Sequence, residues 1–280
     1  MKKNLSRLFI IAAMLFSLDS HAQLTPAPSS TQTIIQDFGL GKITLTYSRP
    51  NVKGRKIFGY TEPYNTVWRT GANAATTITF TDDVMLEGHK VAAGEYGLFS
   101  IPGEGEWTII LNKTAKQWGA YDYKAADDYL RFTIKPVKIQ ENVETLTMQF
   151  TNVFPTSADF NILWEHTALV VHLTTDIDAK VMARIDSAMQ TANKPYYDAI
   201  IYYWNNNKDM DKALSWAIAL QTVPGFPPYV PKLWLARVEL KKGDKAAAIK
   251  AAQEGIAAAK AGNSTEYVRL NTEVLDEASK

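Results

Sequence analysis

The sequence of 280 residues contains no cysteine. Disulfide bonds are therefore excluded, and so is a lipid anchor carried by a cysteine at a cleavage site. A chain of this length buries roughly 70–75% of its unfolded surface when it folds. We therefore expect the protein to be held together by its hydrophobic core alone.

Neither sign of charge is in excess. The chain has 30 Lys and Arg residues against 29 Asp and Glu residues, a formal net charge of +1. Proteins that bind nucleic acids carry a concentrated basic surface that neutralises phosphates. The balanced composition predicts no nucleic-acid partner.

Long apolar runs are also missing. A membrane-spanning helix needs roughly 18 consecutive apolar residues, whereas the run at residues 8–18 is shorter and is followed by Asp19. Lys2, Lys3 and Arg7 precede this run and small residues lead up to Ala22, a pattern typical of a secretory signal peptide. We predict a signal peptide at 1–22, no transmembrane segment in the mature chain, and a periplasmic or secreted protein.

The familiar catalytic motifs do not occur. There is no Gly-x-Ser-x-Gly elbow, no His-Glu-x-x-His pair and no phosphate-binding loop. The mature histidines His89, His166 and His172 have no partner at metal-ligand spacing. We predict no catalytic residue, no metal site and no cofactor, although a sandwich enzyme can assemble a site that no local motif reveals.

What the sequence does contain is a change of hydrophobic period. From residue 34 to about 173 apolar residues mostly alternate, as at Trp107, Ile109 and Leu111, which indicates about nine short strands in an antiparallel β-sandwich or barrel. We expect the last two strands at 160–164 and 168–174, joined by a hairpin at 165–167.

After Asp176 apolar residues recur every three or four positions, which is typical of amphipathic helices. The sequence therefore predicts an α+β protein of two domains, a β domain at 23–175 and a helical domain at 176–280. Within the second domain, Ile200-Ile201 and Ala213-Leu214 correspond to Leu235-Ala236 and Ala248-Ile249 at a constant offset of 35, close to the tetratricopeptide period of about 34. This half resembles a tetratricopeptide array, and a plain bundle of helical hairpins explains the same spacing.

Polar residues of unusual choice gather in the loops of the β half. The candidate ligand-binding residues are Arg49, Lys53, Arg55, Trp68, Arg69, Asn73, Asn112, Trp118 and Tyr121. Guanidinium groups bind carboxylate or phosphate through paired hydrogen bonds, and aromatic rings can stack on sugar rings. The structural alternative is that the cations tie neighbouring turns together and the indoles lie in the core.

These loops carry a family resemblance. The strings YSRP at 47–50, IFG at 57–59, WRTGAN at 68–73, AGEYGLFSIP at 93–102 and WGAY at 118–121 follow one pattern. On them, residues 40–173 resemble the domain of unknown function 2911 family of secreted Bacteroidetes proteins. The resemblance implies a secreted β domain, often with a similar helical tail, and no established reaction. The chain departs from the pattern at Glu62, Asn65 and Ala74, where members often have an apolar residue, glycine and glutamate.

The sequence favours a non-catalytic binding or interaction module in the cell envelope. On this hypothesis the β domain binds a polar or anionic ligand or a glycan, and the helical domain binds another envelope protein. A hydrolase or lyase that uses the Arg/Asn/Trp loops, and a purely structural interaction protein, are the alternatives.

Overall fold

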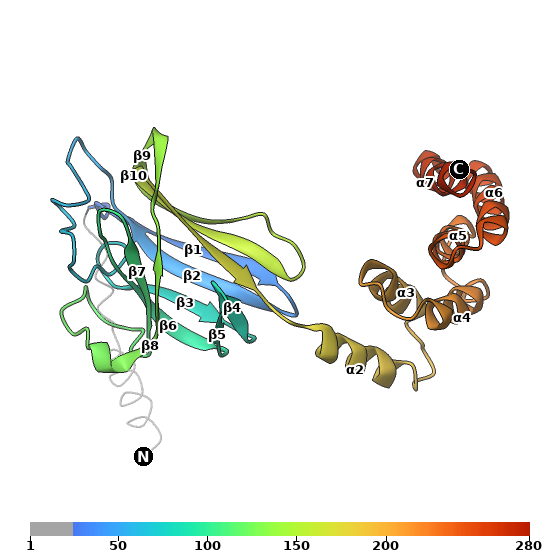
Figure 1. The fold of residues 1–280 in the computed structure, drawn as a ribbon, viewed down its shortest axis with the longest axis horizontal. Coiled ribbons are helices and arrows are strands. Elements are labelled where there is room, and N and C mark those ends of the chain that lie inside the picture. The colour runs from blue at the N-terminus through green and yellow to red at the C-terminus, as the bar shows by residue number, and fades with distance from the viewer. Residues whose placement is uncertain (1–24) are drawn as a thin grey trace, which may run out of the picture. The chain divides into compact units, whose positions relative to one another are not determined.

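The computed structural model describes residues 25–280, so the predicted signal peptide lies outside the described residues. Contacts divide the chain into two compact units, one that ends at Ile177 and one that spans Asp178–Lys280. The first contains the strands and the second contains α-helices (Figure 1). The predicted α+β layout in two parts is confirmed.

The β unit consists of two antiparallel sheets. In spatial order, the larger sheet contains β1 (Ser30–Phe38), β2 (Gly41–Arg49), β3 (Thr76–Phe80), β6 (Gly94–Ile101), β7 (Trp107–Asn112) and β8 (Asp128–Ile134). The smaller sheet contains β5 (His89–Val91), β4 (Val84–Leu86), β10 (Ser157–Thr174) and β9 (Val137–Thr151). A single 3-10 turn, η1 (Ala125–Asp127), precedes β8.

The alternation of residues along the strands places the core between these sheets. In β2, Ile43, Leu45 and Tyr47 are buried while the residues between them are only partly covered. Leu146 of β9 and Trp164 of β10 join the same hydrophobic cluster from the smaller sheet. Because one face of each sheet supplies this core, the unit is a sandwich.

The hairpin expected at 165–167 is wrong. Residues on both sides of it belong to the single strand β10, which pairs with β9 before and after the interruption. Its register shifts between Leu163 and Thr167, and Glu165 has a φ of +54°, so the chain makes a β-bulge there. A bulge also interrupts the alternation of residues, but it bends the strand without reversing it.

The second unit consists of α-helices. They are α2 (Asp178–Ala188), α3 (Tyr196–Asn205), α4 (Met210–Leu220), α5 (Tyr229–Lys242), α6 (Lys245–Ala261) and α7 (Thr265–Ala278). From α3 onward each helix packs on the next, and α5 also contacts α7. The helices therefore form successive hairpins with an added contact between alternate helices.

The repeat in the sequence corresponds to equivalent positions in two of these hairpins. Ala213 of α4 and Ala248 of α6 are both fully buried, because a small side chain lets the paired helices approach closely. Asp209 and Asp244, at the same offset, each accept backbone N–H bonds at the start of α4 and α6. The hairpins α3–α4 and α5–α6 thus place corresponding residues of the sequence repeat at equivalent positions, as both a tetratricopeptide-like array and a plain bundle of helical hairpins would.

Candidate functional site

Arg49 holds the two sheets together. Its Nε donates to the Leu146 carbonyl at 3.0 Å and its Nη2 donates to Thr147 Oγ1 at 3.0 Å, so the β2 side chain is anchored on β9. These bonds occupy the guanidinium within the fold. Arg49 has the structural role that was the alternative to ligand binding.

Asn112 and Trp68 are also parts of the interior. The Asn112 amide donates to the Lys124 carbonyl and to Asp128, and its oxygen accepts the Thr114 N–H. Trp68 is 4% exposed and donates from Nε1 to the Gly71 carbonyl at 3.0 Å. Its ring packs in an aromatic cluster with Phe58, Trp107 and Trp164. Neither side chain is accessible to a ligand.

Lys53 and Arg55 border a hollow of about 390 Å³. This Lys53 hollow is lined by Pro28, Ser29, Pro50, Asn51, Lys53, Arg55 and Ala72. Arg55 donates from Nε to the Val52 carbonyl and from Nη2 to the Asn51 carbonyl, which fixes the guanidinium at the rim. Lys53 is exposed, and its backbone N–H bonds the Glu144 carboxylate.

The remaining predicted residues come together. The loop at 73–75 bonds the loop at 117–119: Ala75 N donates to the Gln117 carbonyl at 3.0 Å and Gly119 N to the Asn73 carbonyl at 3.0 Å. A Cβ atom at Gly119 would lie 2.8 Å from the Tyr121 ring and 3.3 Å from Nη1 of Arg69. We call Arg69, Asn73, Trp118 and Tyr121 the Arg69 patch.

Glu62 adds a titratable group beside this patch. Burial raises the pKa of its carboxyl to about 7, and the positive charges of Arg69 and Arg55 oppose part of that rise. The carboxyl therefore changes its charge near neutral pH, next to two of the predicted cations. The sequence singled out Glu62 only as a departure from the family pattern.

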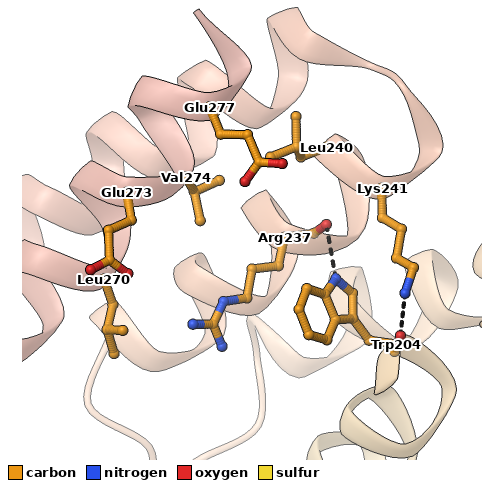
Figure 2. Close-up of a pocket in the computed structure, with 8 residues that line it drawn as sticks. All are labelled: Trp204, Arg237, Leu240, Lys241, Leu270, Glu273, Val274 and Glu277. Atoms are coloured by element: carbon orange, nitrogen blue, oxygen red, sulfur yellow. Dashed lines mark hydrogen bonds between the residues drawn. The ribbon is translucent and has the colours of Figure 1, made fainter. Parts of the chain in front are cut away.

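A second concave site lies in the helical unit, on residues that no sequence motif indicates. This α5–α7 pocket has a volume of about 420 Å³ (Figure 2). It is lined by Trp204, Arg237, Leu240, Lys241, Leu270, Glu273, Val274 and Glu277. Arg237 and Lys241 are four residues apart and so lie on one face of α5, which is the signal that could have found them.

Aromatic rings hold the two cations of this pocket. The guanidinium carbon of Arg237 is 5.7 Å from the Trp204 ring centroid, and Lys241 Nζ is 4.7 Å from it. Trp204 Nε1 donates to the Arg237 carbonyl, and Lys241 donates to the Trp204 carbonyl, as Figure 2 shows. Such cation–π contacts strengthen where water is excluded.

Burial lowers the pKa of Arg237, although nearby Glu273 opposes the shift. Figure 2 shows the guanidinium extending toward Leu270 and Glu273 of α7. No acceptor in the described part of the chain receives a hydrogen bond from it. The arrangement offers unused donors to a ligand carboxylate.

Two further properties bear on function. Within residues 25–280, no group of three or more His, Asp or Glu side chains is placed to hold a metal ion. None of the helices in that range is both long and apolar enough to cross a membrane.

Comparison with known proteins identifies a family for the β unit. No curated protein and no solved structure matches this chain. A family model covers residues 29–173, slightly more than half of the chain and nearly all of the β unit. The loops that carry the motif pattern belong to the two-sheet sandwich that this family model covers. The chain belongs to the family described as protein of unknown function (DUF2911).

Proposed function

We propose that this protein is an exported, non-catalytic interaction module whose helical unit binds an extended polypeptide segment in the α5–α7 pocket. The partner segment carries a carboxylate that faces α5 and a basic side chain that faces α7. The half-buried guanidinium of Arg237 is the observation that carries this proposal.

A partly buried cation without an acceptor has lost hydration and gained only contacts with aromatic rings. The guanidinium carbon lies 5.7 Å from the Trp204 centroid and 4.8 Å from the Trp234 centroid, and these contacts orient its donors before a ligand arrives. A carboxylate fits a guanidinium through two parallel hydrogen bonds. Binding would therefore restore the hydrogen bonds that Arg237 lacks.

The charges of the pocket define the partner further. Arg237 and Lys241 lie on α5, whereas Glu273 and Glu277 lie on α7. Leu240, Leu270 and Val274 supply apolar surface between these charges. A wholly acidic or wholly basic segment would meet repulsion on one wall, and a segment with both charges is complementary to both.

The test selects random short peptides against the full mature chain and measures their affinities by fluorescence anisotropy. We expect the selected peptides to contain a carboxylate and a basic residue. Arg237→Met should weaken their binding by about tenfold, which corresponds to about 1.4 kcal/mol. Lys250→Met, on the exposed surface of α6, is the matched control and should leave affinity unchanged. Selection of peptides that bind both variants equally would refute the proposal.

Export is the second part of the proposal, and it is supported by the basic start and apolar run of the first 22 residues. Mass spectrometry of the protein purified from its native cells should give an N-terminus near Gln23. A mature pool that still begins at Met1 would exclude export by this route.

A further inference from the structure

Two large aromatic side chains are exposed on a loop that the fold holds in place. Trp118 is 64% exposed and Tyr121 is 82% exposed. Trp118 lies within the segment 117–119, which is bonded to 73–75, and Tyr121 comes two residues after that segment. Ala74 and Trp118 also form an isolated β-bridge. Exposed aromatic surface on an ordered backbone loses little conformational entropy when a ligand covers it.

A guanidinium lies beside these rings. Gly119 has a φ of +67°, and the contacts described above show that Tyr121 and Arg69 both pack against its backbone. Nε of Arg69 is buried and has no hydrogen-bond acceptor among the described residues. Gly119 therefore brings a cation and an aromatic ring to the same point of the surface.

The Lys53 hollow adjoins the Arg69 patch. Ala72 lines the hollow, and its neighbour Asn73 donates from Nδ2 to the carbonyl of Ser29, which also lines it. Arg55 at the hollow and Arg69 in the patch both act on the carboxyl of Glu62. The two features therefore lie next to each other on the β unit.

The hollow and the patch together present cations that have no carboxylate partner among the described residues. Lys53, Arg55 and Arg69 form no ion pair with a carboxylate in the chain from residue 25 onward. Other lysines, such as Lys42 and Lys232, do form such pairs. The surface thus combines unpaired positive charge with exposed aromatic rings.

We propose that the Arg69 patch and the Lys53 hollow together bind an acidic oligosaccharide, with sugar rings on Trp118 and Tyr121 and sugar carboxylates on the cations. The apolar faces of sugar rings stack on indole and phenol rings, and carboxylates suit guanidinium and ammonium donors. Single-stranded nucleic acid combines the same features, but its affinity requires many phosphate contacts and a basic protein.

The experiment measures binding of the whole mature chain by isothermal titration calorimetry. The probes are oligogalacturonate and oligomannuronate, with maltohexaose as a neutral sugar and oligothymidylate as a nucleic acid. We expect both carboxylated sugars to bind, with an affinity that falls as salt is added, and we expect the neutral sugar to bind at least about tenfold more weakly.

Matched variants locate the site. Trp118→Ala and Tyr121→Ala should each weaken the acidic sugars by about tenfold or more, whereas Phe154→Ala removes a ring that is 62% exposed elsewhere and should change nothing. Lys53→Glu should abolish binding. Lys90→Glu makes the same change of net charge at an exposed position on β5 and should leave binding intact.

Several results would overturn the proposal. One is failure of both carboxylated sugars to bind at millimolar concentration, and another is equal affinity for maltohexaose. Tighter binding of oligothymidylate that is lost in the same variants would assign the surface to nucleic acid instead. Loss of binding in Phe154→Ala or Lys90→Glu would show that the sugar binds elsewhere.

Discussion

The guanidinium carbon of Arg237 lies 4.8 Å from the centroid of the Trp234 ring, which is itself 6% exposed. The Arg237 side chain thus contacts a buried indole of α5 and also lines the α5–α7 pocket. Its methylene groups cover apolar surface while its charged end faces the pocket. The contributions of the stem and of the charge can be separated by substitution.

Arg237→Met keeps the unbranched stem and removes the charge. We expect the melting temperature to stay within about 2 °C of the wild type, because the desolvated cation has no paired carboxylate whose loss would destabilise the fold. Differential scanning calorimetry measures this directly. A fall of many degrees would mean that the guanidinium bonds the protein itself, and the case for a ligand at this pocket would be lost.

Trp68 and Trp118 should respond in opposite ways to truncation. Trp68→Ala leaves a cavity in the aromatic cluster and should cost about 3–5 kcal/mol of the free energy of unfolding. Trp118→Ala removes a ring that is 64% exposed and should change that free energy by less than about 0.5 kcal/mol. Urea unfolding followed by circular dichroism compares the two. Equal losses would mean that Trp118 is packed as tightly as Trp68.

This pair shows what the sequence can and cannot predict about the site. Both indoles lie in loops within three residues of a glycine, and residue type alone does not distinguish them. The difference arises from distant contacts, since the Trp68 ring meets Trp107 and Trp164 in the core while Trp118 is 64% exposed. Local patterns contain no information about which loop the opposite sheet will cover.

The fold was more predictable because periodicity reports directly which face of an element is buried. Alternation located the strands of the sandwich, and the offset of 35 located the paired alanines Ala213 and Ala248. The sequence predicts a hairpin at Glu165 where the structure has a bulge. A bulge and a hairpin interrupt the alternation of residues in the same way, and they differ in whether the partner strand β9 continues alongside both halves, as it does here. The α5–α7 pocket was missed because three separate helices form it.

Gly255 should not tolerate a methyl group. In a helix interior Gly→Ala usually stabilises by about 1 kcal/mol, but a Cβ atom at Gly255 would lie 2.1 Å from Oδ1 of the buried Asn271. We expect Gly255→Ala to destabilise the protein by about 1–3 kcal/mol.

A double substitution tests this cause. Asn271→Ala removes the atoms that clash, so Gly255→Ala should cost much less in that background than in the wild type, as a double-mutant cycle of thermal unfolding measures. Additive losses would show that Asn271 is not the obstacle.

Glu62 should make the stability of the β unit depend on pH. Its carboxyl has a pKa raised from 4.5 to about 7 in the folded protein, chiefly through burial. Between these two values the folded protein binds a proton that the unfolded chain has released, so the free energy of unfolding falls as pH rises. The stabilising contribution is present in full below pH 4.5 and is lost as pH rises through about 7. The full contribution is at most about 3 kcal/mol.

Glu62→Gln removes the titration while keeping a neutral side chain of the same size. The variant should match the wild type near pH 4.5 and should have a higher melting temperature than the wild type at pH 8, because only the wild type must then hold a charge in a half-buried position. Asn65→Asp is the control for an exposed carboxyl. Because residue 65 is exposed in a turn, the added carboxyl should leave the pH profile almost unchanged. Calorimetry from pH 4.5 to 8 gives all three profiles. If the difference between the wild type and Glu62→Gln does not vary with pH, then Arg69 and Arg55 hold the carboxylate ionised throughout, and these two cations are paired internally instead of being free for a ligand.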